Sequence, residues 1–204
     1  MLTPEAASQG GLNAEYLESL KLLEAKSPGA VDRLKMVAQQ GYAPAQEKLG
    51  ELFDDPKGLM PADKDAAFDW TKKAAEGGLA GAMNRLAMMY YEGSGVSRDP
   101  SLTAVWLRRA AKRGEINSAF NLGALYMKGE GVPANPTEAY EWMMIAAKLG
   151  DTGQAAQTAA TLKSQLTDAQ IAKVHDEVES FQPLTDGSDA SSDSTSASAS
   201  KSNG

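Results

Sequence analysis

The chain has 204 residues, 42% of them hydrophobic but only 6% aromatic, and it contains no cysteine. The absence of cysteine excludes disulfides and thiolate chemistry. A formal net charge of −7 argues against nucleic acid or an anionic membrane as the main partner, because both favour dense Lys/Arg patches. No stretch approaches the roughly 18 apolar residues of a membrane span. The start "MLTPEAASQGG" lacks the basic and apolar regions of a signal peptide, so we expect a soluble chain.

The first part of the chain carries only a weak form of the repeat pattern. We expect residues 1–11 to be disordered. Residues 12–26 ("LNAEYLESLKLLEAK") have the pattern of a helix, and they begin a degenerate unit that we place at 12–41.

The middle of the chain is an internal repeat. The segment "YYEGSGVSRDP" at 90–100 recurs 36 residues later as "YMKGEGVPANP" at 126–136. The match continues outside the loop, where Trp106 corresponds to Trp142, and an earlier copy contains Trp70. We therefore expect repeats at about 42–78, 79–114 and 115–150, each too small to bury its apolar face without a neighbour.

Each repeat reads as two helices joined by a turn. Gly93 and Gly129 stand where a glycine can end the first helix in the left-handed conformation. Asp99 and Asn135, each followed by proline, have the pattern of an N-cap and first helical position. The Gly-x-Gly loop could instead cradle a phosphate, but it follows a helix and lacks a third glycine or a Gly-Lys-Ser/Thr ending. The pattern therefore favours a helical hairpin.

The C-terminal part predicts two capping helices and a tail. Residues 151–182 lose the repeat pattern, and Thr167 and Gln170 have the spacing of a capping box. From residue 183 the chain is rich in serine and aspartate, which predicts a disordered tail over 183–204.

These repeats resemble the Sel-1-like family, which is related to tetratricopeptide repeats. The family pattern is carried most fully by "NLGALYMKGEGVPANPTEAYEWMMIAAKLG" at 121–150. We therefore expect an all-α fold, a short right-handed α-solenoid of stacked helical hairpins. Segments such as "GYAPAQEKLGELF" are also similar to the periplasmic repeats of PodJ-type bacterial polar localisation factors.

Candidate catalytic and metal-binding groups are few. His175 is the only histidine and stands in a polar helix without a placed nucleophile, so we interpret it as a surface residue. Asp54 and Asp55 lack the ligand order of a calcium loop and are better explained as a helix end. We therefore predict no catalytic residue, no metal site and no cofactor.

The partner-binding surface is a hypothesis that follows from the family resemblance, which implies that the first helices of the hairpins line the concave side. Met88, Tyr91 and Met127 would then form an apolar strip with Arg85 and Asn121 as polar anchors. Burial of Met88 and Met127 would exclude this strip. The full set consists of Glu47, Lys48, Glu51, Asn84, Arg85, Met88, Tyr91, Asn121, Ala124, Met127 and Lys128.

The leading functional prediction is a non-enzymatic scaffold that binds a protein or peptide segment, with no nucleic acid partner and no membrane insertion by this chain. The PodJ resemblance implies a role in bacterial cell polarity or at the envelope. A small-molecule or cell-wall-fragment binder or hydrolase is the alternative, and a spacer or self-association module is a third. We expect a cytoplasmic location from the missing signal, or a periplasmic one if the chain is a piece of a PodJ-like protein.

Overall fold

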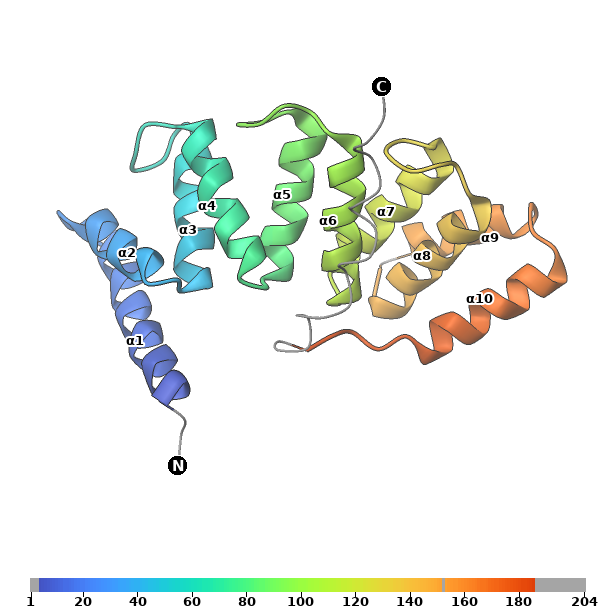
Figure 1. The fold of residues 1–204 in the computed structure, drawn as a ribbon, viewed down its shortest axis with the longest axis horizontal. Helices are drawn as coiled ribbons and strands as arrows, with labels where there is room; N and C mark the ends of the chain where they lie inside the picture. The colour runs from blue at the N-terminus through green and yellow to red at the C-terminus, as the bar shows by residue number, and fades with distance from the viewer. Residues whose placement is uncertain (1–3, 152, 186–204) are drawn as a thin grey trace, which may run out of the picture.

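The computed structural model describes residues 4–151 and 153–185, and this part of the chain is entirely helical, with ten helices and no strand (Figure 1). In chain order they are α1 (Pro4–Glu24), α2 (Ala30–Gln39), α3 (Ala43–Asp54), α4 (Lys64–Glu76), α5 (Ala80–Glu92), α6 (Pro100–Lys112), α7 (Ile116–Lys128), α8 (Pro136–Leu149), α9 (Gln154–Lys163) and α10 (Asp168–Ser180). The prediction of an all-α fold is confirmed.

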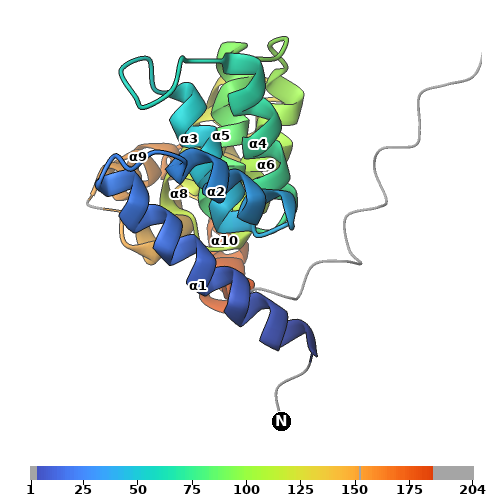
Figure 2. The ribbon, with the colours of Figure 1, turned by 90° about the vertical axis from the view of Figure 1, so that its left-hand side faces the viewer.

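The helices form a row of antiparallel hairpins. The pairs α3–α4, α5–α6 and α7–α8 pack most closely, and α4 against α5 and α6 against α7 join one hairpin to the next. Figure 1 shows these hairpins side by side, and Figure 2 shows α1 crossing the N-terminal end of the row. This is the stacked arrangement of a short solenoid, in which each unit buries its apolar face on its neighbours.

The second helix of each repeat begins at the predicted type of cap. The side chains of Asp63, Asp99 and Asn135 each accept backbone N–H groups of the following first turn, at 2.9–3.3 Å. Their own N–H groups donate to carbonyls near the end of the preceding helix, which closes all three loops alike. Gly93 and Gly129 end α5 and α7 with φ of 76° and 69°, so the predicted left-handed glycine ends are confirmed.

The apolar core is divided into two clusters. The larger runs from the end of α4 to α10 and contains Leu86, Leu122 and Tyr140 among its buried members. The smaller lies among α1, α2 and α3, with Trp70 of α4 packed against it. The two clusters therefore meet at α4.

The predicted disorder of residues 1–11 is wrong for residues 4–11, which form the first part of α1. Pro4 stands at the first helical position, where its missing N–H leaves no bond unmade, and alanines that favour a helix follow it. Gly10 and Gly11 lie within this helix, and among the described residues no atom lies within 4 Å of a Cβ placed at either glycine.

The C-terminal helices close the row in different ways. α9 and α10 both pack on α8, and α10 lies away from α9 (Figure 1). The predicted capping box at the start of α10 is present, with reciprocal bonds between Thr167 and Gln170. Residues 183–185 return to the end of α6, where the Leu184 N–H donates to the Lys112 carbonyl at 2.8 Å. Residues 183–185 of the predicted tail therefore lie against the end of α6, and residues 186–204 lie outside the described residues.

None of the helices in the described ranges is both long and apolar enough to cross a membrane.

Candidate protein-interaction surface

The eleven residues of the hypothesised partner surface all lie on α3, α5 and α7, the first helices of the three repeats. None of them is buried: Met88 and Tyr91 are partly exposed and Met127 is 47% exposed. We call this set the first-helix face. It consists of Glu47, Lys48, Glu51, Asn84, Arg85, Met88, Tyr91, Asn121, Ala124, Met127 and Lys128.

Its N-terminal part is a charged network between α3 and α5. Glu51 accepts from Lys48 one turn earlier at 2.9 Å and from Arg85 of the next repeat at 3.0 Å. The exposed fractions of these three side chains are between 36% and 38%. The Glu51 carboxylate therefore links Lys48 of α3 to Arg85 of α5.

Glu47 lies beside this network without a hydrogen bond or ion pair of its own among the described residues. Burial raises the pKa of Glu47, the neighbouring Glu51 carboxylate raises it further, and Arg85 and Lys48 lower it. Its carboxylate faces α5, since a Cβ on Gly81 would lie 3.1 Å from Glu47 Oε1. Glu47 is therefore an incompletely neutralised group at the α3–α5 junction.

The junction between α5 and α7 is held by a neutral contact. The Ser118 hydroxyl donates to Asn84 Oδ1 at 2.8 Å, and Ser118 is fully buried. Asn84 is therefore partly engaged in joining the repeats and is less available to a partner than the exposed members of the face.

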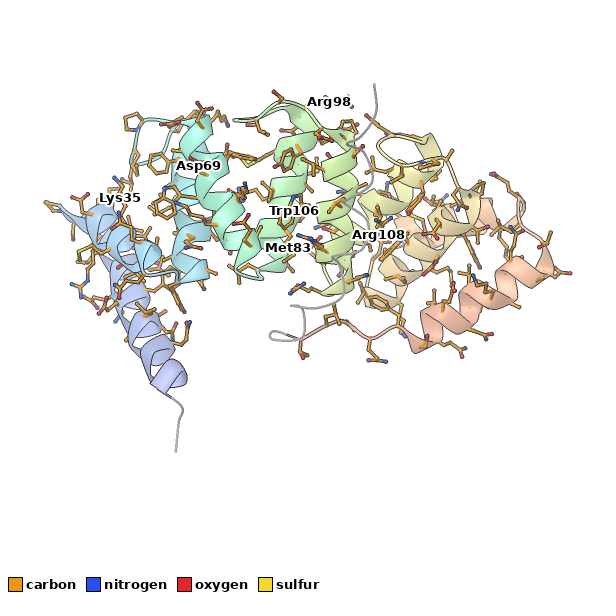
Figure 3. All side chains as sticks on the ribbon, in the orientation of Figure 1. Lys35, Asp69, Met83, Arg98, Trp106 and Arg108 are labelled. Carbon is orange, nitrogen blue, oxygen red and sulfur yellow. The ribbon has the colours of Figure 1, made fainter. Side chains whose placement is uncertain are left out.

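Tyr91 is surrounded by two residues that the sequence analysis missed. The Arg98 guanidinium lies over the Tyr91 ring at 5.4 Å, and Arg98 Nε donates to the Tyr91 carbonyl at 3.0 Å. Arg98 comes from the loop after α5 (Figure 3) and forms an ion pair with Glu130 of the next loop. The Tyr91 hydroxyl is 3.5 Å from Glu130. No motif marks either loop position, because both vary between the repeats.

The C-terminal part of the face has few internal contacts. Among the described residues, Asn121 and Lys128 form no hydrogen bond or ion pair, and Ala124 packs against the apolar core beneath it. Ala124 and Met127 therefore give α7 an accessible apolar surface, and Asn121 and Lys128 add two polar side chains that a partner could contact.

A separate pocket of about 550 Å³ lies at the turns after α6 and α8 and includes Gly114, Glu115, Asn117 and Asp151 in its lining. Its two carboxylates already serve as helix caps: Glu115 accepts from the Ser118 N–H, and Asp151 accepts from backbone N–H groups at the start of α9. Their hydrogen-bonding capacity is therefore largely used within the fold.

The remaining candidate groups are dispersed. In the described residues no three His, Asp or Glu side chains gather as a metal site would require. His175 is exposed, and its Nε2 lies 3.0 Å from the Tyr140 hydroxyl, so it contributes to the packing of α10 on α8. Asp54, at the end of α3, pairs with Lys64 at 2.5 Å across the loop.

Stacked two-helix units with glycine-closed turns define a helical-hairpin repeat protein. A family model described as Sel1 repeat matches residues 43–79, 80–115 and 116–151. The chain belongs to the Sel1 repeat family. Proteins of this family are generally interaction scaffolds without enzymatic activity, and their repeats commonly bind proteins.

Similar proteins occur in several bacteria. A crystallised Sel1 repeat protein from Oxalobacter formigenes is 30% identical with a TM-score of 0.68, over 77% of this chain and 47% of that one. The protective antigen c5321 of uropathogenic Escherichia coli shares the fold at 21% identity and a TM-score of 0.56, over 87% of this chain and 48% of that one. The uncharacterised protein NMB1327 of Neisseria meningitidis serogroup B is 34% identical over 48% of this chain. The match spans about a fifth, 19%, of NMB1327.

Proposed function

We propose that this protein is a non-enzymatic scaffold that binds a segment of another protein along the first-helix face. The observation that carries this proposal is an accessible row of apolar side chains, Met88, Tyr91 and Met127, on neighbouring first helices. Exposed apolar groups flanked by polar anchors suit an extended or helical peptide, which buries its side chains while polar groups fix its register.

The rigid junctions between repeats support the same function. Arg85 is held by Glu51, so this polar group of the face is positioned before a partner arrives. Preorganised groups lose less conformational entropy on binding and so leave more of the interaction energy as affinity.

The cellular setting of this scaffold rests on sequence resemblance. The likeness to PodJ-type polar localisation factors implies a partner at the bacterial envelope or cell pole. The alternative function, a small-molecule or cell-wall-fragment binder or hydrolase, would require convergent carboxylates in a pocket. The two carboxyl groups whose pKa values are raised, Glu47 and Glu141, instead lie on different helices, α3 and α8. This arrangement favours the scaffold.

Photo-crosslinking with a matched control surface tests the proposal. A photo-reactive phenylalanine analogue is placed at Met127 of the first-helix face or at Val105 of α6, which is 39% exposed and lies on a second helix. We expect covalent adducts with discrete proteins from position 127. A Met88→Glu substitution should abolish these adducts and leave those from position 105 unchanged.

A second pair of variants separates binding from folding. Leu102→Glu, on exposed α6 surface, introduces the same charge as Met88→Glu without touching the first-helix face. Circular dichroism and thermal unfolding should first establish that both variants are folded. Equal loss of adducts in both variants, or no loss in either, contradicts the proposal, and adducts only between copies of this chain identify a self-association module.

A further inference from the structure

The three first helices present equivalent positions on the same side of the row. The carbonyls of Phe53, Tyr90 and Tyr126 each accept the N–H of the residue that caps the next helix, so these three residues are equivalent. Counting from them aligns five accessible positions of each first helix and its end. They hold Glu47, Lys48, Glu51, Asp54 and Asp55 at α3, Asn84, Arg85, Met88, Tyr91 and Glu92 at α5, and Phe120, Asn121, Ala124, Met127 and Lys128 at α7.

The charge at these positions changes from one repeat to the next. The α3 positions hold four carboxylates and one ammonium, a side-chain charge of −3, and the α5 positions hold one group of each sign. The α7 positions hold a single charged group, Lys128. None of the side chains is buried. This side of the row is therefore acidic at α3, and apolar with one positive charge at α7.

Glu47 is the carboxylate at the α3 end that has no partner. Glu51 accepts from two cations, and Asp54 and Asp55 are engaged with the loop that follows α3. Glu47 forms no hydrogen bond or ion pair among the described residues, and burial and the Glu51 carboxylate raise its pKa although two cations are near. A further cation beside Glu47 would stabilise its charged form.

Two partly exposed tyrosines stand beside this carboxylate. The rings of Tyr16 of α1 and Tyr42, which precedes α3, are 5.4 Å apart between centroids, and the Tyr42 hydroxyl donates to Asn13 Oδ1 at 2.8 Å. Burial raises the pKa of Tyr16 most, and the carboxylates of Glu51 and Glu47 raise it further, so Tyr16 lies close to both. A carboxylate beside an aromatic ring suits a guanidinium group, which pairs with the one and stacks on the other.

We propose that the partner segment of the first-helix face carries an arginine that binds Glu47 beside Tyr16, with its apolar side chains over α5 and α7. This inference rests on the proposed function and adds the chemistry and the direction of the partner. A segment bound in the reverse direction would place its arginine toward Lys128, and repulsion between like charges disfavours that arrangement. The overall charge of −7 also attracts a basic segment.

Selection from a phage-displayed library of random peptides on the full chain tests the chemistry. We expect the peptides that bind the native chain but not Met88→Glu to carry an arginine at one end and apolar residues in the remainder. Glu47→Gln should weaken the binding of such a peptide by roughly fivefold, as for a partly exposed ion pair. A peptide with citrulline in place of the arginine should bind the native chain and Glu47→Gln equally, because it keeps the shape of arginine without the charge.

Two controls separate this contact from folding and from overall charge. The free energy of unfolding of Glu47→Gln should not fall, because burial already disfavours the charged form of Glu47. Glu76→Gln removes the same charge from an exposed position of α4, outside the first-helix face, and should leave the affinity unchanged. An equal loss of affinity in Glu47→Gln and Glu76→Gln would show that only overall charge matters, and it would overturn the proposal.

Photo-crosslinking of a selected peptide tests the direction. Trypsin releases residues 36–48, which contain Tyr42 and Glu47, apart from residues 114–128, which contain most of α7. A benzophenone next to the arginine should attach to residues 36–48, or to the tryptic segment 1–21, which contains Tyr16. A benzophenone at the opposite end of the peptide should attach to residues 114–128. The reverse pattern overturns the assigned direction.

The selection also distinguishes failure of this inference from failure of the proposed function. Peptides that depend on Met88 but show no preference for arginine, or that bind Glu47→Gln as tightly as the native chain, overturn the inference and leave the scaffold function standing. If no selected peptide depends on Met88, both are contradicted.

Discussion

Gly131, the second glycine of the third-repeat loop, lies directly against the carbonyl oxygen of Pro100, which begins the second helix of the preceding repeat. A Cβ on Gly131 would lie 2.0 Å from that oxygen. Gly95 stands in the same relation to Lys64, at 2.1 Å, one repeat earlier. The Gly-x-Gly loop is therefore a contact between repeats as well as a turn, and its second glycine is required for both its positive φ and its missing side chain.

Substituting Gly131 should lower the free energy of unfolding by more than substituting a glycine that has only a positive φ and no close neighbour. Gly78 also has a positive φ, of 97°, but has open space around its α-carbon. We expect Gly78→Ala to lower the free energy of unfolding by about 1–2 kcal/mol through backbone strain. Gly131→Ala should lose about 1–3 kcal/mol more from steric overlap. Urea unfolding of both variants measures the difference, and equal losses contradict the role in repeat stacking.

Thr71 and Thr103 are buried threonines in successive second helices. Replacing each by valine should change the free energy of unfolding in opposite directions. The Thr71 hydroxyl is buried and has no hydrogen-bond partner among the described residues, whereas the Thr103 hydroxyl donates to the Asp99 carbonyl at 2.9 Å. We expect Thr71→Val to raise the free energy of unfolding by about 1 kcal/mol, because it removes an unsatisfied group. Thr103→Val should lower it by about 1 kcal/mol. A lower melting temperature for Thr71→Val would show that the hydroxyl is satisfied.

The repeat fold was predictable from the sequence because its determinants are local. Caps such as Asp99 and Asn135 and helix ends such as Gly93 act within a few residues, and their spacing repeats, so one sequence contains several copies of the same signal. The paths of residues 4–11 and 183–185 were not predictable in this way. The contact of Leu184 with Lys112 depends on how α10 packs, which leaves no periodic trace in the sequence.

The attachment of α10 to α8 should weaken as pH rises. Burial between α8 and α10 raises the pKa of Glu141 from 4.5 to about 7, with further contributions from Glu138 and Glu177 and an opposing one from Lys173. The folded state binds this proton more tightly than the unfolded chain does. The resulting stability is therefore fully present below about pH 4.5 and is lost as pH rises to 7.

Glu141→Gln should remove this pH dependence. Above pH 7 the variant should be more stable than the native chain by about 1–2 kcal/mol, a value reduced from full linkage because the carboxyl group is partly exposed. At low pH the two should converge. Glu179→Gln, at an exposed position of α10, is the control and should change the profile little. If the free energies of unfolding of Glu141→Gln and the native chain changed equally with pH between 4.5 and about 7, the assignment would be contradicted.

Lys148 should control the opening of the end of α10. Lys148→Met keeps most of the side-chain length but removes the ammonium that donates to three carbonyls. Loss of these bonds, about 1–2 kcal/mol, should speed hydrogen exchange of the backbone amides of residues 178–181 by roughly tenfold. Lys163→Met, at an exposed position at the end of α9, should leave exchange in α10 unchanged. Unchanged exchange after Lys148→Met would show that apolar packing alone holds α10.

The accessibility of the first-helix face could be predicted from the sequence, but the contacts made by its residues could be predicted only in part. The family resemblance led us to expect Met88 and Met127 on an accessible face, and neither side chain is buried. It could not identify Arg98 or Glu130, which reach Tyr91 from loops whose residues differ between repeats. Nor could it show that Asn84 is engaged by Ser118, since that bond depends on the packing of α5 against α7.

In the part of the chain that the structure describes, α1 and α10 cover the two ends of the hairpin row. A row of similar hairpins has two ends that each resemble an interior junction, so in principle one chain could stack on the next without limit. α10 leaves the row after α9 and packs along α8, so the last hairpin is not followed by another second helix in register. At the other end, α1 crosses the row obliquely (Figure 2). The two helices therefore cover apolar side chains of the first and last hairpins that a further hairpin would otherwise have to cover.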